Sequence, residues 1–436
     1  MKLFGGVIPI TGLTFLMFAI FVICFLGYLL GRITIKGVSL GTAGVFIIAI
    51  FFGAFFSSTI SSTLTLGGTD ISSNAFKIVE NIGLILFVGA VGMIAGPNFF
   101  KNLKANFKSY ILIGFVIILA GALATLLCFV IGCSIVTVPE AEAALGISKA
   151  QYMMAMLVGI MSGSLTSTPA FSAAKATVAT VVSTTEAADA IQDVVTVGHA
   201  IAYIFGVIGV VLFVQIVPKM LKANMEEERK KIVIVDTGAG QIKDVNKKLI
   251  DMDEFGFAAF GLVVVVGIFF GMIKVPLSSA GLSGTTFSLT TTGGVLISGL
   301  VFAHFGHIGP FSLKVNGKVL ECFREYGLML FLIGAGVPGG ASFVRYFQPI
   351  YFVYGVVITI IPMIIGYFLA KKLLKLPLLN VLGSITGGMT STPALGTLIK
   401  TAGTSDVASA YASTYPIALI CVVLASQFLI LIFGAH

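Results

Sequence analysis

Long apolar runs follow one another along the whole chain and are separated by short polar segments. A helix needs roughly 20 residues to cross the hydrocarbon core of a bilayer. The hydropathy pattern therefore predicts ten membrane-spanning helices and an all-α polytopic membrane protein. Their expected ranges are 9–31, 38–56, 77–98, 108–133, 190–217, 254–273, 287–306, 325–344, 347–370 and 409–433.

Two further apolar stretches, 151–184 and 378–403, are each interrupted at the centre by the same polar string, TSTPA. A hydroxyl residue followed by proline is typical of a helix start, because the hydroxyl caps free N–H groups and proline has none to lose. We predict that Thr168 and Thr392 cap short helices that open at Pro169 and Pro393. Broken backbone survives in a membrane only inside protein or beside water, so the two breaks are expected to meet in a cavity.

The basic residues give an orientation, since Lys and Arg favour the cytoplasmic side of short loops. On this rule the segment 219–253 is a cytoplasmic linker and both chain termini lie outside. The stretch 151–184 then enters the membrane from outside, and 378–403 enters it from the cytoplasm. We expect two re-entrant hairpins in halves of opposite orientation, residues 1–218 and 254–436, each with five crossing helices. Such an arrangement is an inverted repeat.

The sequence supports a repeat independently of charge. The segment GLILFVGAVGMIAGPNF (83–99) aligns without a gap over GLMLFLIGAGVPGGASF (327–343), with glycine, leucine and phenylalanine at matching places. The TSTPA strings occupy later, corresponding places in the two halves. The repeat therefore extends from ordinary helices to the interrupted ones.

Composition narrows the classes of function. The chain is 57% hydrophobic and 10% charged, which is far outside the range of soluble domains. Its net charge is +8, and the largest cluster of charged residues is the segment 219–253. Because few basic residues lie elsewhere, a nucleic-acid partner is not expected and the lipid bilayer is. The five cysteines and four histidines show no metal-binding spacing, and we expect no metal and no cofactor.

The breaks carry the candidate binding chemistry. A helix N-terminus offers free N–H groups and a partial positive charge, which suits a carboxylate or another anion. The candidate ligand-binding residues are Ser164, Thr166, Ser167, Thr168, Gly388, Thr390, Ser391 and Thr392, and Gly163 and Gly387 would allow close approach of the backbone. The alternative is that these small residues only cap and pack helices. The doubling of the motif favours a site for a small molecule with two anionic groups.

Other polar residues leave alternatives open. His199 and Tyr415 could line the cavity, or could be buried beside local partners. Lys175 and Lys400 could balance an anion, but lysines near helix ends more often extend to the membrane interface, and we favour that interpretation. No Asp or Glu lies clearly in mid-membrane, which favours substrate exchange over a carboxylate proton relay and leaves sodium coupling open.

Several segments together carry a resemblance to a known family. They are GYLLGRITIKGVSLGTAG, GLILFVGAVGMIAG, both TSTPA strings, GHAIAYIFGVIG, FSLTTTGGVLISGLVFAHFG, GLMLFLIGAGVPGG and YPIAL. The chain resembles the aspartate:alanine exchanger family of bacterial secondary transporters over nearly its whole apolar part. The resemblance implies exchange of small anionic amino acids or dicarboxylates such as aspartate, glutamate or succinate. It also implies a homodimer in the inner membrane with an elevator-type movement of a core domain. Many members carry soluble regulatory domains between their halves, whereas this chain has only the linker 219–253.

The expected function is therefore antiport of a small anionic substrate by alternating access. The alternatives are an anion channel, or a transporter of another small organic anion, including a sodium-coupled one. An enzyme is not expected, because a hydroxyl nucleophile would need a base and only His199 is a candidate for one.

Overall fold

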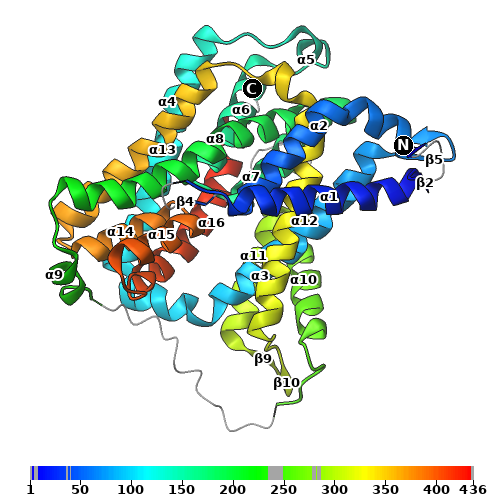
Figure 1. The fold of residues 1–436 in the computed structure, drawn as a ribbon. Coiled ribbons are helices and arrows are strands. Elements are labelled where there is room, and N and C mark those ends of the chain that lie inside the picture. The colour runs from blue at the N-terminus through cyan, green and yellow to red at the C-terminus, as the bar shows by residue number, and fades with distance from the viewer. Residues whose placement is uncertain are drawn as a thin grey trace. The chain divides into compact units, whose positions relative to one another are not determined.

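The computed structural model describes residues 2–3, 8–35, 38–39, 41–233, 249–276, 281 and 286–433, and these residues are mostly helical (Figure 1). The helices are α1 (Gly12–Arg32), α2 (Ala43–Thr63), α3 (Ser72–Asn106), α4 (Leu112–Ile135), α5 (Glu140–Ala144), α6 (Lys149–Ser164), α7 (Thr168–Val178), α8 (Thr185–Met220), α9 (Met225–Lys230), α10 (Phe257–Gly271), α11 (Thr290–Phe305), α12 (Gly317–Tyr346), α13 (Ile350–Phe368), α14 (Leu378–Gly388), α15 (Thr392–Ala402) and α16 (Val407–Phe433), with π-helical turns η2 (Phe107–Ile111) and η4 (Leu369–Leu373).

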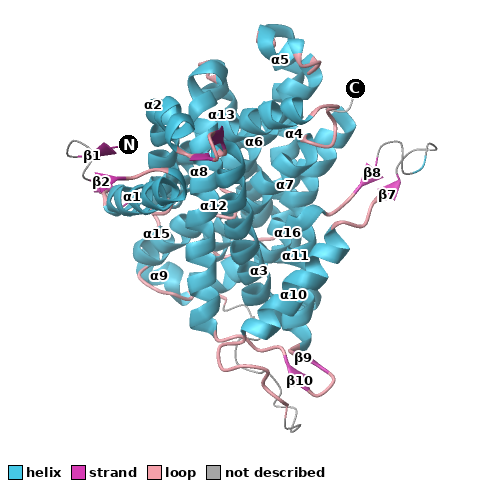
Figure 2. Cartoon of the chain, turned by 90° about the vertical axis from the view of Figure 1, so that its right-hand side faces the viewer, coloured by secondary structure: helices cyan, strands magenta, loops and turns pink. Residues whose placement is uncertain are grey.

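Strands in the described part of the chain are confined to short antiparallel pairs, one before α1 and the others at turns between helices (Figure 2). They are β1 (Lys2–Leu3) with β2 (Ile8–Pro9), β3 (Thr34–Ile35) with β4 (Val38–Ser39), β5 (Thr65–Leu66) with β6 (Thr69–Asp70), β7 (Val275–Pro276) with β8 (Thr286–Phe287), and β9 (His307–Ile308) with β10 (Phe311–Ser312). The all-α prediction is therefore confirmed.

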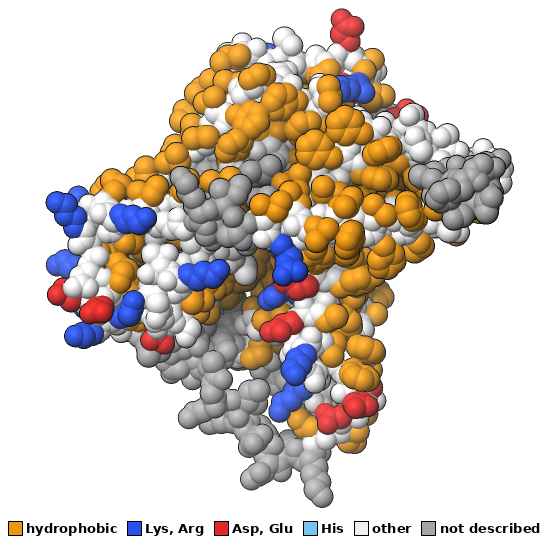
Figure 3. Space-filling model, in the orientation of Figure 1, with side chains coloured by type: hydrophobic (Ala, Val, Ile, Leu, Met, Phe, Trp, Pro, Cys, Tyr) orange, Lys and Arg blue, Asp and Glu red, His pale blue; other side chains and the backbone are white. Residues whose placement is uncertain are grey.

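Eight helices of the described chain are long and apolar enough to cross a membrane, so the polytopic prediction is confirmed. The other two predicted spans, 254–273 and 287–306, form the shorter helices α10 and α11, of 15 and 16 residues. At 1.5 Å per residue these helices are about 22 and 24 Å long. Figure 3 shows hydrophobic side chains over much of one face, while charged side chains gather near its left edge, where Figure 1 places α9.

The chain divides into two units, which we describe separately. The first comprises residues 1–87 and 322–348, and so contains α1, α2, the beginning of α3 and most of α12. Its core is a cluster of buried apolar side chains from these four helices: Phe15, Leu16, Ile20, Ile23, Val45, Ala49, Ile60, Leu64, Ala75, Phe76, Val79, Met329, Leu330, Ile333 and Val337.

Within the first unit, α3 and α12 cross with their backbones in close contact. A Cβ added to Gly83 would lie 2.6 Å from the carbonyl oxygen of Gly327, and a Cβ added to Gly327 would lie 2.7 Å from that of Gly83. The same two atoms would also crowd the backbone nitrogens of Phe331 and Phe87, respectively. These are the residues that the sequence alignment pairs, 83 with 327 and 87 with 331, so the aligned segments pack on each other reciprocally.

The second unit comprises residues 88–321 and 349–436 and contains both TSTPA strings. In its first hairpin, α6 packs along α8 and runs in the same direction, because Gly159 lies against Val195 and Gly163 lies against His199. The Gln151 side chain near the start of α6 donates to the carbonyl oxygen of Val181, just beyond α7, at 2.7 Å. The outer ends of α6 and α7 therefore lie side by side, as a hairpin requires.

The second hairpin has the same construction. Helix α14 runs alongside α16 in the same direction, since Gly383 lies against Val407 and Gly387 lies against Tyr411. The beginning of α14 and the end of α15 both contact the short segment that follows α8, through Asn380 and the carbonyl oxygen of Ala402. Both ends of this hairpin are therefore at the end of the unit where α8 finishes.

The start of α10 has a carboxylate cap. Asp253 accepts hydrogen bonds from the backbone N–H groups of Phe257 at 2.7 Å and Ala258 at 2.9 Å. The bond from Ala258, followed by that from Phe257, holds the pKa of Asp253 below its usual value. Its contribution to stability is therefore present above about pH 4, where an unfolded aspartate is already ionised, and is lost as pH falls through the lower folded pKa.

We expect Asp253→Asn to reduce protection of the first turn of α10 against hydrogen exchange at pH 7, and to make little difference near pH 2. Peptide-resolved exchange mass spectrometry, corrected for the intrinsic pH dependence of exchange, measures this effect. Asp251→Asn is the matched control, because it removes a nearby exposed carboxylate. Equal protection in the wild type and Asp253→Asn at pH 7 would contradict the assignment of the cap.

Candidate functional site

The tips of the two hairpins are joined by a reciprocal pair of hydrogen bonds. The hydroxyl of Thr166 donates to the carbonyl oxygen of Met389 at 2.9 Å, and the hydroxyl of Thr390 donates to the carbonyl oxygen of Leu165 at 2.7 Å. Both threonines are nearly buried, at 8% and 6% exposed. The two breaks therefore meet, as predicted, by direct contact, while the cavity expected between them stays a prediction.

The backbone at each tip is held in a sparsely populated conformation. Thr166 has φ 52° and Thr390 has φ 49°, in the left-handed region that β-branched residues rarely adopt. Such strain costs on the order of 1–3 kcal/mol and persists only where surrounding contacts fix it. Here the left-handed residue turns the chain within three residues, between the last residue of one helix and the first of the next. It also supplies the hydroxyl that bonds to the other tip.

The predicted caps are wrong by one residue. Ser167 and Ser391, with extended backbone, are the N-cap residues of α7 and α15, and Thr168 and Thr392 are the first helical residues. Pro follows as the second residue in each helix. The reason is the left-handed turn at the preceding threonine, which brings the chain into the helix one residue earlier than the Thr-Pro pair alone suggests.

The two tips differ in how their polar groups are used. Ser167 caps α7, because its hydroxyl accepts from the N–H of Ala170 at 3.4 Å, and Thr168 next to it is only 4% exposed. Ser391 is fully buried, yet its hydroxyl has no hydrogen-bond partner among the described residues. Thr392 is exposed. The second tip therefore differs from the first in the exposure of Thr392 and in the buried Ser391 hydroxyl that caps nothing.

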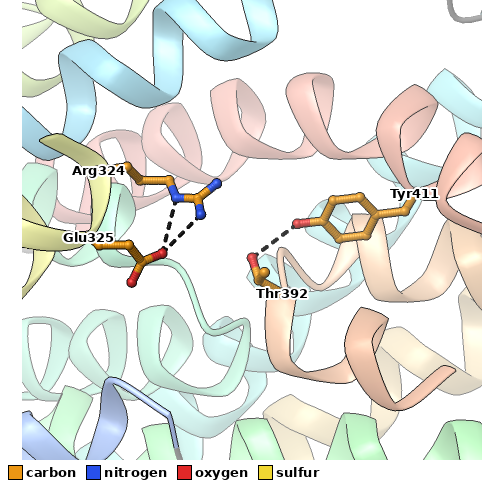
Figure 4. Close-up of polar contacts among 4 residues, drawn as sticks. All are labelled: Arg324, Glu325, Thr392 and Tyr411. Atoms are coloured by element: carbon orange, nitrogen blue, oxygen red, sulfur yellow. Dashed lines mark hydrogen bonds and ion pairs between the residues drawn. The ribbon is translucent and has the colours of Figure 1, made fainter. Parts of the chain in front are cut away.

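Helix α16 brings a tyrosine to the second tip. The hydroxyls of Thr392 and Tyr411 face each other at 3.3 Å (Figure 4). The ring of Tyr411 stacks on that of Tyr415, with centroids 5.1 Å apart. Tyr415 was predicted from the sequence to line the site, whereas Tyr411 was not. Their spacing of four residues, which places both on one helix face, was the available signal.

His199 belongs to the packing between α6, α7 and α8. Its ring is fully buried and stacks on Phe171 at 4.2 Å and on Tyr203 at 5.1 Å between centroids. Its Nδ1 lies 2.8 Å from the hydroxyl of Ser162, which itself donates to the carbonyl oxygen of Gly159. Because that hydroxyl has one proton, Nδ1–H is assigned as the donor to Ser162. The structure favours the alternative of a buried histidine with a local partner.

Most of the remaining candidates near the tips contact protein. The Ser164 hydroxyl donates to the carbonyl oxygen of Gly355 at 3.1 Å. Gly163 lies against the backbone of α8, Gly387 against the backbone of α16, and Gly388 against the side chain of Ile117. Pro169 is buried with the first tip, whereas Pro393 is partly exposed with the second. These residues shape the hairpins, whereas Thr392 is exposed and its hydroxyl faces that of Tyr411.

The two lysines differ in burial. Lys175, in the last turn of α7, is only 8% exposed, and its ammonium group lies 5.8 Å from the centroid of the Phe171 ring. The prediction that it extends to the membrane interface is therefore wrong, because the stacked aromatic rings below it favour a cation in place. Lys400, in the corresponding turn of α15, is exposed as predicted.

The described residues contain no cluster of three or more His, Cys, Asp or Glu side chains suited to a metal ion. The five cysteines are all free thiols. The polar side chains at the tips are the hydroxyl groups of serine and threonine.

Comparison with known proteins indicates a membrane transporter. The family described as a predicted permease membrane region, Asp-Al_Ex, matches residues 19–219 and 259–431. An uncharacterized transporter of Bacteroides fragilis is 26% identical over 565 aligned residues, covering 94% of this chain and 97% of that protein. An uncharacterized transporter of Desulfotalea psychrophila is 40% identical over 176 residues, covering 39% of this chain and 32% of that protein.

A third relative, an uncharacterized transporter of Rhodopirellula baltica, is 23% identical over 573 residues, with 94% and 98% coverage. The family match omits residues 220–258, which include the segment that contacts the second hairpin. It covers both hairpins, together with α4, α13 and nearly all of α8 and α16. From its family match and its relatives, the chain is a membrane transporter, and it belongs to the Asp-Al_Ex family of permease membrane regions, the aspartate:alanine exchanger family.

Proposed function

We propose that the protein is a secondary transporter that exchanges small anionic amino acids or dicarboxylates, with the hairpin tips as its substrate site. The observation that carries the proposal is the reciprocal pair of hydrogen bonds between Thr166 and Met389 and between Thr390 and Leu165. Two broken helices that meet in the interior of a membrane protein are typical of transporter sites. Membership in a transporter family supports the same conclusion.

The internal symmetry supports alternating access. When two halves of a chain are related by a two-fold axis, each contact from one half to the other is accompanied by the reciprocal contact. This holds for the threonines of the tips and for Gly83 with Gly327. We therefore interpret residues 1–218 and 254–436 as inverted repeats, and 219–253 as their cytoplasmic linker. The hairpins would move with a core domain, in an elevator-type cycle, against a dimer-forming scaffold in the bacterial inner membrane.

We assign the substrate to the second tip. There the N-terminus of α15 carries a partial positive charge, and the hydroxyls of Ser391, Thr392 and Tyr411 are the donors around it. A carboxylate accepts several hydrogen bonds at once, which matches this set of donors. The first tip is buried and its Ser167 is used as a cap. The more exposed second tip is therefore the one to which we assign the substrate.

Counterflow in liposomes tests the proposed exchange. Purified protein is reconstituted into vesicles loaded with aspartate, glutamate, succinate or alanine, and uptake of labelled aspartate is followed. Internal substrate should accelerate uptake through an exchanger, whereas a channel would show no such acceleration. A thermal-shift screen of the same compounds is a second test, since a ligand that binds the folded form raises its apparent stability. Absence of both effects for every anion would overturn the proposal.

Removal of one hydroxyl at the second tip should weaken substrate binding. We expect Tyr411→Phe to raise KM for counterflow about threefold to tenfold, because a typical hydrogen bond contributes about 0.5–1.5 kcal/mol. Maximal velocity should change less. Tyr415→Phe is the matched control, as it leaves the stacked pair intact and should keep KM within about twofold. A larger effect at position 415 than at 411 would show that the wrong tyrosine had been assigned to the site.

A further inference from the structure

Residues 224–233, which are separated from the end of α8 by three residues, form a strap across the outer end of the second hairpin (Figure 1). Asn224 caps α9 through its side chain, which accepts from the N–H of Glu226 at 3.0 Å. Met225 and Ile232 pack on a buried apolar cluster at the base of the hairpin, which also includes Leu378 and Leu398. The strap is therefore a folded element with its own cap and an apolar contact surface.

Arg229 fastens the strap to the end of α15. Its Nε donates to the carbonyl oxygen of Ala402, the last residue of the helix. A Cβ added to the next residue, Gly403, would lie 2.6 Å from the guanidinium of Arg229, and Gly403 has φ 65°. A cation at a helix C-terminus also interacts favourably with the helix dipole. Charge and close contact thus both hold this end of the hairpin.

Asn380 fastens the strap to the beginning of α14. Its side-chain oxygen accepts from the N–H of Val233 at 3.0 Å, and its side-chain nitrogen donates to the carbonyl oxygen of Val233 at 2.7 Å. The same nitrogen lies 3.0 Å from the hydroxyl of Tyr110, to which it donates. Asn380 is 1% exposed. The side-chain amide of Asn380 therefore bonds both the N–H and the carbonyl oxygen of Val233 in the strap.

The first hairpin is fastened differently. Gln151 donates to the carbonyl oxygen of Val181, so the hairpin's two ends are tied to one another within 30 residues of sequence. The second hairpin depends on a segment that belongs to the connection between the two halves of the chain. A displacement of that connection would be transmitted to the second hairpin without touching the polar groups at its tip.

We propose that Arg229 and Asn380 are positioning residues, through which the strap sets the placement of the second hairpin and thereby the rate of its movement in transport. This inference rests on the proposed function, since it concerns the hairpin to which substrate binding is assigned. The strap lies outside the family match, which ends at residue 219 and resumes at 259. Control of the hairpin from this connection is thus a property that the membrane region alone does not determine.

Two variants release the strap from its two fastenings. Arg229→Ala removes the bond to α15, and Val233→Pro removes the N–H that Asn380 accepts while leaving the hairpin itself unchanged. We expect each to lower the maximal velocity of counterflow about fivefold to tenfold, with KM kept within about twofold, because the tip donors are untouched. Arg229→Lys, which keeps the charge and can still donate, should recover most of the wild-type velocity.

The control is Lys231→Ala. It removes a basic side chain from the same segment, one that pairs with Glu228 at 2.8 Å on the exposed side of the strap, and should leave velocity unchanged. Equal loss in this control and in Arg229→Ala would show that only the charge of the segment matters. Wild-type velocity in both Arg229→Ala and Val233→Pro would overturn the proposal, as would a rise in KM that accounts for the whole loss.

Limited trypsin digestion tests the attachment of the strap independently of transport activity. Cleavage after Lys230, followed by mass spectrometry, should become about fivefold to tenfold faster in Val233→Pro and stay at the wild-type rate in an exposed control, Glu227→Gln. This readout does not require a known substrate, so it still tests the strap if no anion supports counterflow. Unchanged cleavage in Val233→Pro would show that the fastening at Asn380 does not hold the strap and would overturn its positioning role.

Discussion

Thr166→Val and Thr390→Val are each expected to lower the rate of counterflow at least tenfold while the protein still folds. Each change removes a hydroxyl that donates to a carbonyl oxygen at the opposite tip, that of Met389 or Leu165. A buried carbonyl left without its partner costs about 1–3 kcal/mol, and 1.4 kcal/mol corresponds to a factor of ten. Valine keeps the shape and the β-branching of threonine, so the cost of the left-handed backbone conformation is about the same in the wild type and in each valine variant.

Serine is the matched control at both positions. It retains the hydroxyl, and Thr166→Ser and Thr390→Ser should keep transport within about threefold of the wild type. Because the two bonds hold one contact, the loss in the double valine variant should be smaller than the sum of the single losses in free-energy terms. Wild-type transport in both single valine variants would remove the tips from the mechanism. Additive losses would show that the two bonds act separately.

The interrupted helices were predictable because their signal is local. A polar string that contains Thr-Pro inside an apolar run can be read from a few neighbouring residues, and both hairpins are found where it predicts them. The position of the cap was missed by one residue, since it depends on the left-handed conformation of Thr166 and Thr390. That conformation is stabilised by bonds between residues more than 220 positions apart, which no local pattern contains.

The roles of individual polar residues were less predictable for the same reason. A histidine in an apolar helix has the same sequence context whether it binds substrate or stacks between aromatic rings, and His199 stacks between Phe171 and Tyr203. Lys175 was expected at the membrane interface, and only the fold reveals the aromatic ring over which it is buried. The role of Asn380 was not predicted from the sequence, because it bonds the backbone of Val233, and a backbone partner has no residue-type signal.

The glycines near the two tips allow close contact between helices, so replacing them should lower the stability of the folded protein. Gly163→Ala is expected to destabilise the protein by about 2–3 kcal/mol, because helices α6 and α8 touch there through their backbones. The new Cβ would lie 2.5 Å from the carbonyl oxygen of His199 and 2.8 Å from the backbone nitrogen of Tyr203. Neither atom can move unless a whole helix shifts, so the yield of monodisperse protein and its apparent melting temperature should both fall.

Gly388→Ala is the matched comparison at the second tip. There the new Cβ would meet the end of the Ile117 side chain, which can change its rotamer at a cost of about 1 kcal/mol. Melting curves of the two variants in the same detergent should therefore show a clearly larger loss for Gly163→Ala. An equal loss would mean that close backbone packing of α6 on α8 does not govern stability. A larger loss for Gly388→Ala would place the more rigid contact at the second hairpin, and would conflict with its assignment as the tip that remains accessible to substrate.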